Sequence, residues 1–519
     1  MDTKALRQKI LDLAIRGKLV PQDPNDEPAE VLLERIREQK QQMFKEGKLK
    51  KKDIKNDTII FKGEDNLHYE KFQDGTVKCI EDEIPFEVPE GWAWCKLNDI
   101  YNFIDYRGAT PTKITNGIPL VTAKNVKSGY IDYTIDDYIS EEEFKERQQR
   151  GISKKGDILF TTEAPLGNAA LADMEKFSAG QRLITFQQYG SKNELINYVM
   201  LMFILSDFFQ QQLYVNKTGS TVAGIKAAIL KTLWIPVPPY NEQLRISNTL
   251  KSAINLIDSI SKNKEILSTS ISNTKSKILD LAIRGKIVPQ DPNDEPASVL
   301  LERIRAEKEE LIKQGKIKRD KKESVIFKGD DNSYYEKIGN KVNCIDEEIP
   351  FELSEGWAFI RLKTAWELIS GRDLSPSEYN DKNDGIPYIT GASNFRNGHI
   401  SLVRWTTVPQ VITRRGDLLL TCKGTIGEIA HNNFGEAHIA RQIMAIRNIY
   451  SLNVDFLALC IEYSMTKIKQ AANVLIPGIS REDILNLVIP IPPTKEQENI
   501  CNKLKATFSA IEHIEKSLN

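Results

Sequence analysis

The longest periodic pattern in the sequence lies near its middle, in a stretch without Gly or Pro. This stretch spans residues 241–284, and apolar residues recur on one heptad position at Leu250, Ile257, Ile271 and Ile278, with Lys264 interrupting the series. A seven-residue apolar repeat predicts a helix of roughly 40 residues whose coiled-coil face is incomplete. Gly285 follows the stretch and is expected to end the helix, because glycine adopts the backbone conformation found at helix C-termini.

Two further elements follow from local patterns nearer the N-terminus. Asp26, Glu27 and Pro28 suit the first turn of a helix. The apolar stripe of this helix comprises Ala29, Leu32, Leu33, Ile36, Met43 and Phe44. Asp74-Gly75 lies between two strand-like runs and predicts a hairpin with a type I′ turn.

Much of this pattern occurs twice in the chain. Residues 10–37 and 278–305 are identical at 26 of 28 positions. Looser matches join residues 83–87 to 348–352, and residues 234–246 to 488–500. The second hairpin segment is one residue shorter than the first, at Gly339-Asn340, and a hairpin loop can absorb such a difference. The repeat indicates a duplicated scaffold around two divergent inserts.

The chain ends repeat the two halves of the long helix. Residues 496–519 match its first half and residues 1–16 its second half. Together they would supply a second helical spacer, although separate docking of the two terminal helices is the alternative.

The expected fold is therefore α+β: two globular α+β domains joined by two long helical spacers, packed as an antiparallel coiled coil in a tandem pseudo-two-fold repeat. The expected boundaries are 1–18 for the N-terminal helix, 19–92 for the first scaffold extension, 93–240 for the first insert domain, 241–286 for the central spacer, 287–357 for the second extension, 358–494 for the second insert domain and 495–519 for the C-terminal helix.

Composition excludes some classes of protein. Lys and Arg total 71 against 72 Asp and Glu, so the net charge of −1 argues against a globally basic nucleic-acid coat and against an acidic tail protein. No apolar run is long enough for a membrane span, and the N-terminus has no apolar signal segment. The six cysteines form no CxxC pair. We expect a cytoplasmic protein with reduced thiols, no metal site and no membrane association.

A search for catalytic motifs finds none. The sequence lacks a GxxxxGK[ST] phosphate loop, a GxSxG elbow and an HExxH zinc motif. Pro238-Pro239-Tyr240 resembles the end of the amino-methyltransferase motif, but Val237 stands where that motif has a polar residue. His431 and His438 are interpreted as surface residues. We therefore expect a chain without an active site of its own.

The insert domains instead carry loops suited to nucleic acid. Residues 107–113 and 124–129 of the first insert are rich in Arg, Lys, Asn, Ser and Thr, and residues 393–398 are the counterpart in the second. Such side chains bind base edges and phosphates. Loops of this composition also occur in many α+β domains, so the pattern alone leaves both interpretations open. The lysine runs 48–52 and 316–322 are interpreted as solvated faces or as phosphate contacts.

The whole layout resembles the specificity subunit of type I restriction-modification systems. The resemblance rests on Gly91-Trp92 and Gly356-Trp357 at the domain entries, on residues 117–131 and 154–161, and on the IP-x-PP-x-x-EQ pattern before each helix. The second domain departs from the first, because it lacks the Gly219-Ser220-Thr221 triplet and reads LIPGIS at 475–480.

This resemblance implies a subunit without catalytic activity that reads double-stranded DNA. Each target recognition domain would read one half of an asymmetric bipartite sequence, and the helical spacers would fix the gap. Two modification subunits would dock on the chain and methylate adenine N6 with S-adenosylmethionine, and restriction subunits would use ATP and Mg²⁺. A DNA-binding chain of neutral net charge fits this assembly, because the methyltransferase partners supply part of the DNA affinity.

Site residues are predicted on the same basis. Lys124, Asn125, Lys127 and Arg107 are the expected base readers of the first domain, and Lys154 and Lys155 are expected on phosphates. The full predicted DNA-binding set is Arg107, Thr110, Lys113, Lys124, Asn125, Lys127, Lys154, Lys155, Arg372, Asn394, Arg396, Arg414, Arg415 and Lys423. Arg182 and Arg441 are assigned either a structural or a reading role. Partner docking is predicted at Asp12, Arg16, Asp280 and Arg284.

Two other functions compete with this interpretation. A stand-alone methyltransferase-nuclease would need the cofactor motifs that the sequence lacks. A coiled-coil scaffold for two protein partners would bind no nucleic acid.

Overall fold

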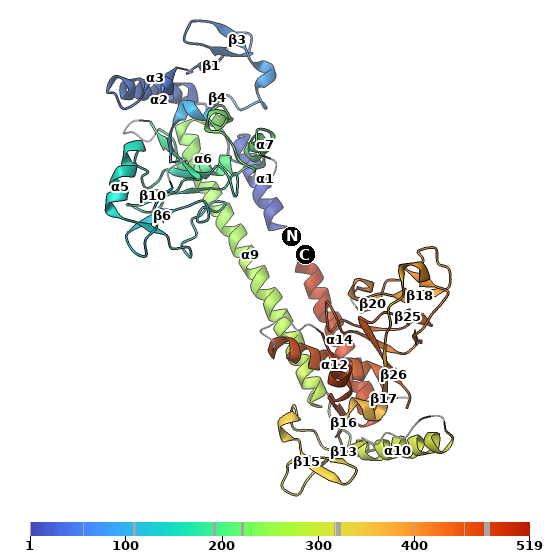
Figure 1. The fold of residues 1–519 in the computed structure, drawn as a ribbon. Helices are drawn as coiled ribbons and strands as arrows, with labels where there is room; N and C mark the ends of the chain where they lie inside the picture. The colour runs from blue at the N-terminus through green and yellow to red at the C-terminus, as the bar shows by residue number, and fades with distance from the viewer. Residues whose placement is uncertain are drawn as a thin grey trace. The chain divides into compact units, whose positions relative to one another are not determined.

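The computed structural model describes residues 2–55, 57–106, 110–189, 194–219, 223–315, 317, 323–396, 398–450, 452–471 and 478–518 (Figure 1). The chain forms two compact units, residues 1–264 and 265–519. Among the described residues, no helix is long and apolar enough to cross a membrane. All six cysteines are free thiols, and Cys95, Cys422, Cys460 and Cys501 are buried.

Unit 1 combines eight described helices with twelve strands, and one further helix, α9 (Tyr240–Ile283), begins in unit 1 and ends in unit 2. The helices are α1 (Thr3–Ile15), α2 (Ala29–Lys45), α3 (Lys51–Ile54), α4 (Leu97–Ile100), α5 (Glu141–Arg147), α6 (Asn197–Ile204), α7 (Asp207–Val215) and α8 (Ala227–Leu230). The strands are β1 (Ile59–Lys62), β2 (His68–Lys71), β3 (Val77–Cys79), β4 (Ala93–Lys96), β5 (Tyr101–Asp105), β6 (Ile118–Val121), β7 (Tyr138–Ile139), β8 (Ile158–Thr161), β9 (Ala169–Leu171), β10 (Ser178–Ala179), β11 (Leu183–Gln188) and β12 (Trp234–Val237).

Unit 2 repeats this order of elements with local differences. Its helices, after the end of α9, are α10 (Ala297–Lys313), α11 (Leu362–Ala365), α12 (Val454–Ala471), α13 (Arg481–Leu485) and α14 (Thr494–Leu518). Its strands are β13 (Ser324–Lys328), β14 (Tyr334–Ile338), β15 (Lys341–Cys344), β16 (Ala358–Arg361), β17 (Trp366–Ser370), β18 (Ile386–Ile389), β19 (Phe395–Arg396), β20 (His399–Ile400), β21 (Trp405–Thr406), β22 (Ile412–Thr413), β23 (Leu418–Thr421), β24 (Ile429–His431), β25 (Ala437–Ile439), β26 (Ile443–Asn448) and β27 (Val488–Ile491).

The two insert domains share one sheet topology. The first has a four-stranded antiparallel sheet in the order β5-β11-β8-β9, and the second has the same arrangement as β17-β26-β23-β24. Beside it, β6 pairs in parallel with β10, and β18 pairs in parallel with β25. The expectation of two related α+β domains is confirmed by this repeated topology.

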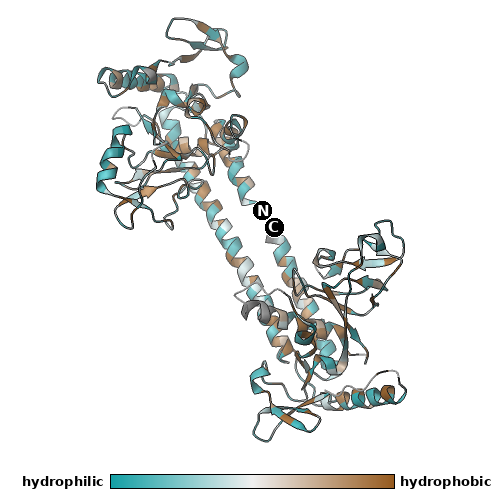
Figure 2. Ribbon diagram, in the orientation of Figure 1, coloured by the Kyte–Doolittle hydropathy of each residue, from teal (hydrophilic) through white to brown (hydrophobic). Residues whose placement is uncertain are grey.

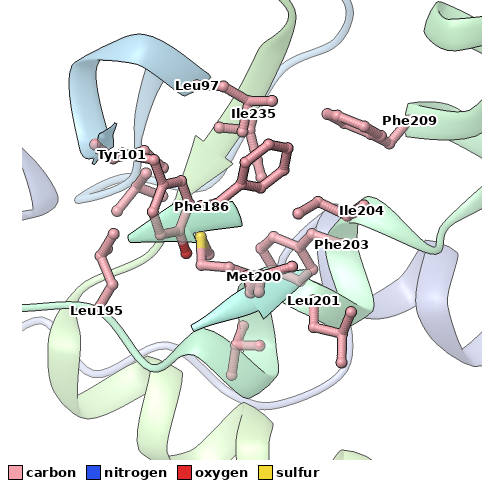
Figure 3. Close-up of a cluster of buried hydrophobic side chains, with 14 of the residues drawn as sticks. Leu97, Tyr101, Phe186, Leu195, Met200, Leu201, Phe203, Ile204, Phe209 and Ile235 are labelled. Carbon is pink, nitrogen blue, oxygen red and sulfur yellow. The ribbon is translucent and has the colours of Figure 1, made fainter. Parts of the chain in front are cut away.

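Each insert domain is closed by a short two-stranded sheet that joins its first and last strands. β4 pairs with β12, and β16 pairs with β27, so the chain leaves each domain beside the point where it entered. A large buried cluster then packs the domain against α9 and the terminal helix. Figure 3 shows part of the cluster in unit 1, where Tyr101 and Phe186 from the sheet face Met200 and Phe203 of α6.

The predicted long helix is confirmed with its ends displaced by one residue. α9 contains 44 residues and carries both polar and apolar segments along its length (Figure 2). Gly285 follows it with φ +69°, a backbone conformation that side chains other than glycine rarely adopt. A Cβ at Gly285 would lie 2.7 Å from the Trp357 ring, so the glycine also allows close packing.

Within each unit, a terminal helix runs antiparallel to its part of α9. In unit 1, Arg7 pairs with Asp258, and Gln22 Nε2 donates to Glu242 Oε1 at 3.1 Å. In unit 2, Lys275 pairs with Glu515 at 2.7 Å, while Lys495 lies 4.0 Å from Asp294. A complete second spacer formed from both terminal helices stays a prediction.

The predicted hairpin exists, but its turn type is corrected. Strands β2 and β3 pair antiparallel, and only Gly75 in the turn has a positive φ (+89°). A type I′ turn needs two such residues, whereas a three-residue loop needs only a glycine at its last position. The shorter second hairpin has only Gly339 and Asn340 between paired Ile338 and Lys341, so the one-residue difference does lie in the loop.

Candidate nucleic-acid interface

Four connections meet at one edge of the first insert domain. Residues 110–113, 122–129, 162–168 and 180–182 are joined by backbone bonds from Gly180 N to Val121 O (2.7 Å), Thr162 N to Arg182 O (3.0 Å) and Gly129 N to Ala169 O (2.8 Å). Thr110 Oγ1 donates to Gln181 Oε1 at 2.8 Å. We call this set of residues the first polar edge.

The second insert domain builds the same edge from residues 371–375, 390–396, 422–428 and 440–442. Ala440 N donates to Ile389 O at 2.9 Å, and Cys422 N donates to Gln442 O at 2.8 Å. Arg372 N donates to Ile439 O at 2.9 Å. These residues form the second polar edge, and the bonds of Ala440 N and Cys422 N match those of Gly180 N and Thr162 N in the first.

Asn125 and Asn394 are not available to a ligand, which corrects their assignment as base readers. Asn125 is 3% exposed; its Oδ1 accepts from Thr122 N (2.9 Å) and Oγ1 (2.7 Å), and its Nδ2 donates to two carbonyls. Asn394 is 1% exposed; its Oδ1 accepts from Thr390 and its Nδ2 donates to Ser401 O at 2.8 Å. Each asparagine therefore fixes the shape of its loop.

The lysines of the first polar edge differ in their ion pairing. Lys124 is exposed and makes no ion pair with the residues that the structure describes. Lys127 lies 3.8 Å from Asp132, and Lys113 pairs with Asp137 at 2.7 Å. Arg107 lies outside the described residues, as do parts of the 219–221 and 475–480 motifs and most of the lysine run at 316–322.

Arg372, Arg396 and Lys423 are all exposed on the second polar edge. His438, predicted at the surface, is instead fully buried beneath this edge, and its Nε2 lies 2.8 Å from Arg372 O. Its Nδ1 accepts from Val411 N at 3.1 Å. Burial lowers the pKa of His438, so the neutral ring supports the loop that carries Arg372.

The paired cations Lys154-Lys155 and Arg414-Arg415 lie at the other end of the sheet. They occupy the turns that precede β8 and β23, whereas the polar edges lie where these strands end. Lys155 pairs with Glu175 at 2.8 Å, and Arg414 lies 4.0 Å from Glu436. A phosphate contact by these four residues stays a prediction, separate from the polar edges.

The predicted docking residues form matching pairs on the repeated scaffold. Asp12 pairs with Arg16 at 2.7 Å, and Asp280 pairs with Arg284 at 2.9 Å. The Arg16 guanidinium lies 4.4 Å from the centre of the Phe86 ring, while Arg284 lies 4.9 Å from that of Phe351. Both pairs are partly exposed, so they serve the fold and remain accessible to a partner.

Sequence reasoning missed the two-residue turn at the centre of each polar edge. Its residues are Gln181-Arg182 in the first domain and Arg441-Gln442 in the second. The two arginines that the sequence singled out are therefore not equivalent. The buried strands that flank each turn fix the register, and they are the only signal that could have aligned the two sites.

Comparison with known proteins identifies the fold and the family. The sequence model of the type I restriction modification DNA specificity domain matches residues 89–268 and again residues 354–519. One chain from a structure of a type I restriction-modification system shares the fold with a TM-score of 0.56 and 19% identity, over 84% of this chain and 94% of that chain.

Curated relatives cover nearly the same length. The chain is 27% identical to the EcoAI specificity subunit of Escherichia coli, over 97% of this chain and 90% of that protein. It is 25% identical to the putative MjaX specificity subunit of Methanocaldococcus jannaschii, over 82% and 89% of the two chains. This chain therefore belongs to the type I restriction modification DNA specificity domain family and carries the family's domain twice.

Proposed function

We propose that this chain selects the DNA sequence on which a type I restriction-modification complex acts. Each insert domain is a target recognition domain that reads one half of an asymmetric, bipartite site in double-stranded DNA. One observation carries the proposal: the DNA specificity domain occurs twice, on one strand order, with different exposed side chains on the two polar edges. Two unlike readers on one frame suit a target with two unlike halves.

The helical spacers set the unspecified gap between the half-sites. α9 is a continuous helix of 44 residues, and a helix has a fixed rise per residue. A second spacer, formed by both terminal helices in an antiparallel pair with α9, would complete the pseudo-two-fold scaffold.

The chemistry belongs to partner subunits in this proposal. Two modification subunits use S-adenosylmethionine to methylate adenine N6, and restriction subunits use ATP and Mg²⁺. This chain contributes binding and orientation. Within the described residues, no group of three or more His, Cys, Asp or Glu side chains could hold a metal ion.

The repeated scaffold offers two equal docking surfaces for the modification subunits. The Asp12–Arg16 and Asp280–Arg284 pairs recur on it, and so does an exposed valine, Val31 in one copy and Val299 in the other, with 43% and 39% exposure. Substitutions at exposed positions usually change stability by less than about 0.5 kcal/mol, so the fold alone does not require the two valines to be identical. Docking of two identical modification subunits would require it.

The proposal is tested by mapping methylated adenines. The chain is co-expressed with its modification subunit in a host without other adenine methylation, and the genome is read by long-read sequencing. The modification subunit alone is the control. We expect methylation at a two-part sequence with a fixed gap only when this chain is present.

Replacing residues 93–240 with the insert of a relative should change one half of that sequence only. A soluble complex that leaves the genome unmethylated would overturn the proposal and favour a protein scaffold.

A further inference from the structure

The turn at the centre of each polar edge is built alike in the two domains. Leu183 N donates to Gly180 O at 3.2 Å, and Ile443 N donates to Ala440 O at 2.9 Å. Each turn therefore has two central residues, Gln181-Arg182 or Arg441-Gln442, between positions that are fully buried.

Neighbouring strands hold the backbone of both turns in place. Gly180 N and Ala440 N bond to the ends of β6 and β18, and the carbonyls of Arg182 and Gln442 accept from Thr162 N and Cys422 N. Thr162 Oγ1 also donates to Arg182 O at 3.1 Å. The backbone frame of the turn is thus equivalent in the two domains, whereas the two central side chains occur in opposite order.

Arginine and glutamine side chains are types that bind base edges. The two turns carry them in opposite order along the chain. Arginine forms paired hydrogen bonds with O6 and N7 of guanine, and glutamine does so with N6 and N7 of adenine. Arg182, Arg441 and Gln442 are exposed, and Gln181 is partly exposed. A rigid turn with exposed central side chains presents such groups at low entropic cost.

A carboxylate from an adjacent loop steadies each arginine. Glu163 lies 3.2 Å from Arg182 Nε, and Asp373 lies 2.7 Å from Arg441 Nε. The carboxylates come from different loops, one after β8 and the other after β17. Each contact engages one edge of the guanidinium and leaves other N–H groups for a ligand.

We infer that the turns at 181–182 and 441–442 are specificity-determining elements, each reading adjacent base pairs of its own half-site through the major groove. Glu163 and Asp373 are positioning residues that act through Arg182 and Arg441. This inference rests on the proposed function, because it concerns which residues read the DNA that the complex methylates.

Single variants within the assembled complex test the inference. Arg182→Ala and Arg182→Lys are made in the first domain, and Arg441→Ala and Arg441→Lys in the second. Lys176→Ala and Lys382→Ala are the matched controls, because these exposed lysines lie outside the polar edges. Methylated sequences are mapped, and the affinity for the wild-type target is measured at several salt concentrations.

We expect Arg182 variants to relax one position of the first half-site, and Arg441 variants to relax one position of the second. Discrimination at that position should fall roughly 10- to 100-fold, while the controls keep the wild-type sequence. The lysine variants keep the charge but lose the paired geometry, so they should relax the sequence with little change in salt dependence.

A reordering test strengthens the assignment. Q181R/R182Q gives the first turn the order of the second and should change the preferred base in the first half-site without altering the second. Glu163→Gln should weaken discrimination at the same position as Arg182→Ala, which a residue needed only for folding would not do.

The outcomes separate this inference from the proposed function. Wild-type methylation of a bipartite site, together with variants that lower methylation equally at all sequences, would overturn the inference alone and assign the turns to phosphate contact. Absence of bipartite methylation with the wild-type chain would overturn both.

Discussion

The indole Nε1 of Trp92 donates a buried hydrogen bond of 2.9 Å to the carboxylate of Glu242. Trp92 directly precedes β4, and Glu242 lies in the first turn of α9, so the bond joins the entry of the first insert domain to the helix that leaves it. Unit 2 repeats the bond between Trp357 and Glu496 at 3.0 Å. The pair is thus part of the duplicated scaffold.

Trp92→Phe should destabilise unit 1 by about 1–3 kcal/mol, because it removes a donor from a buried carboxylate. The phenyl ring would keep the stacking of Trp92 on Phe203, whose centroids lie 6.2 Å apart, so most of the apolar contact survives. Hydrogen exchange measured by mass spectrometry should report faster exchange in residues 1–264.

Trp357→Phe is the matched variant and should affect residues 265–519 instead. Equal exchange throughout the chain in both variants would contradict a local role for these pairs.

The scaffold could be predicted from the sequence because its signals are local and repeated. The heptad series and the helix end at Gly285 place α9 to within one residue, and the second copy of each motif predicts two related insert domains. The apolar stripe of the helix after Pro28 also lies as expected, with Ala29, Leu32 and Ile36 buried.

The site could be predicted only in part, because exposure depends on tertiary contacts. The sequence predicts equally that Asn125 and its neighbour Lys124 contact bases. In the structure, the asparagine is buried and the lysine is exposed. His438 stands beside a loop yet is buried in a strand. The equivalence of Gln181 with Arg441 depends on the register of the buried strands that flank the two turns.

Asn125→Ala should therefore lower the stability of the protein rather than change the DNA sequence that is methylated. Removal of the amide leaves the Asp132 and Ile135 carbonyls and Thr122 N without partners, at an expected cost of about 1–3 kcal/mol. Chemical unfolding measures the loss. Lys124→Ala, one residue earlier, should leave stability unchanged.

Mapping of methylated sites in the same two variants completes this test. A change of one preferred base with Asn125→Ala, at undiminished stability, would restore Asn125 as a direct reader.

The pH dependence of the first insert domain should contain a contribution from Asp157. Burial raises the pKa of Asp157 to about 6, although Lys154 N and Gln187 Nε2 donate to it. The unfolded group titrates near pH 3.9, so between about pH 4 and 6 the folded chain binds more protons and stability falls as pH rises. Asp157→Asn should remove this fall and gain up to about 3 kcal/mol over the wild type at pH 7.

Substitution of Asp417, the counterpart in the second domain, should destabilise the protein instead. Arg447 Nη2 donates to it at 2.9 Å, and Arg414 N at 2.8 Å, so the carboxylate neutralises a partly buried guanidinium. Asp417→Asn should cost roughly 2–4 kcal/mol at pH 7, because it leaves Arg447 with only the more distant carboxylate of Glu367, at 3.9 Å, as a counter-charge. Urea unfolding at pH 7 distinguishes the two variants, because Asp157→Asn should raise the free energy of unfolding and Asp417→Asn should lower it; a change of the same sign in both would contradict the assignment. For Asp157→Asn, the same measurement from pH 4 to 8 checks the loss of the pH dependence.

The repeated docking surfaces predict a stepwise loss of partners. A carboxylate at Val31 or Val299 would lie within an apolar contact, so Val31→Asp and Val299→Asp should each weaken the binding of one modification subunit by at least about tenfold. Native mass spectrometry of the co-purified complex should then find one modification subunit with either single variant and none with the double variant.

Val215→Asp is the control for this experiment. Val215 is 80% exposed on α7, outside the repeated scaffold, so its substitution should leave two modification subunits bound. Retention of both subunits by the double variant would exclude the valines from the docking surface. Loss of both subunits in a single variant would show instead that the two partners bind cooperatively, because independent equal surfaces must be lost one at a time.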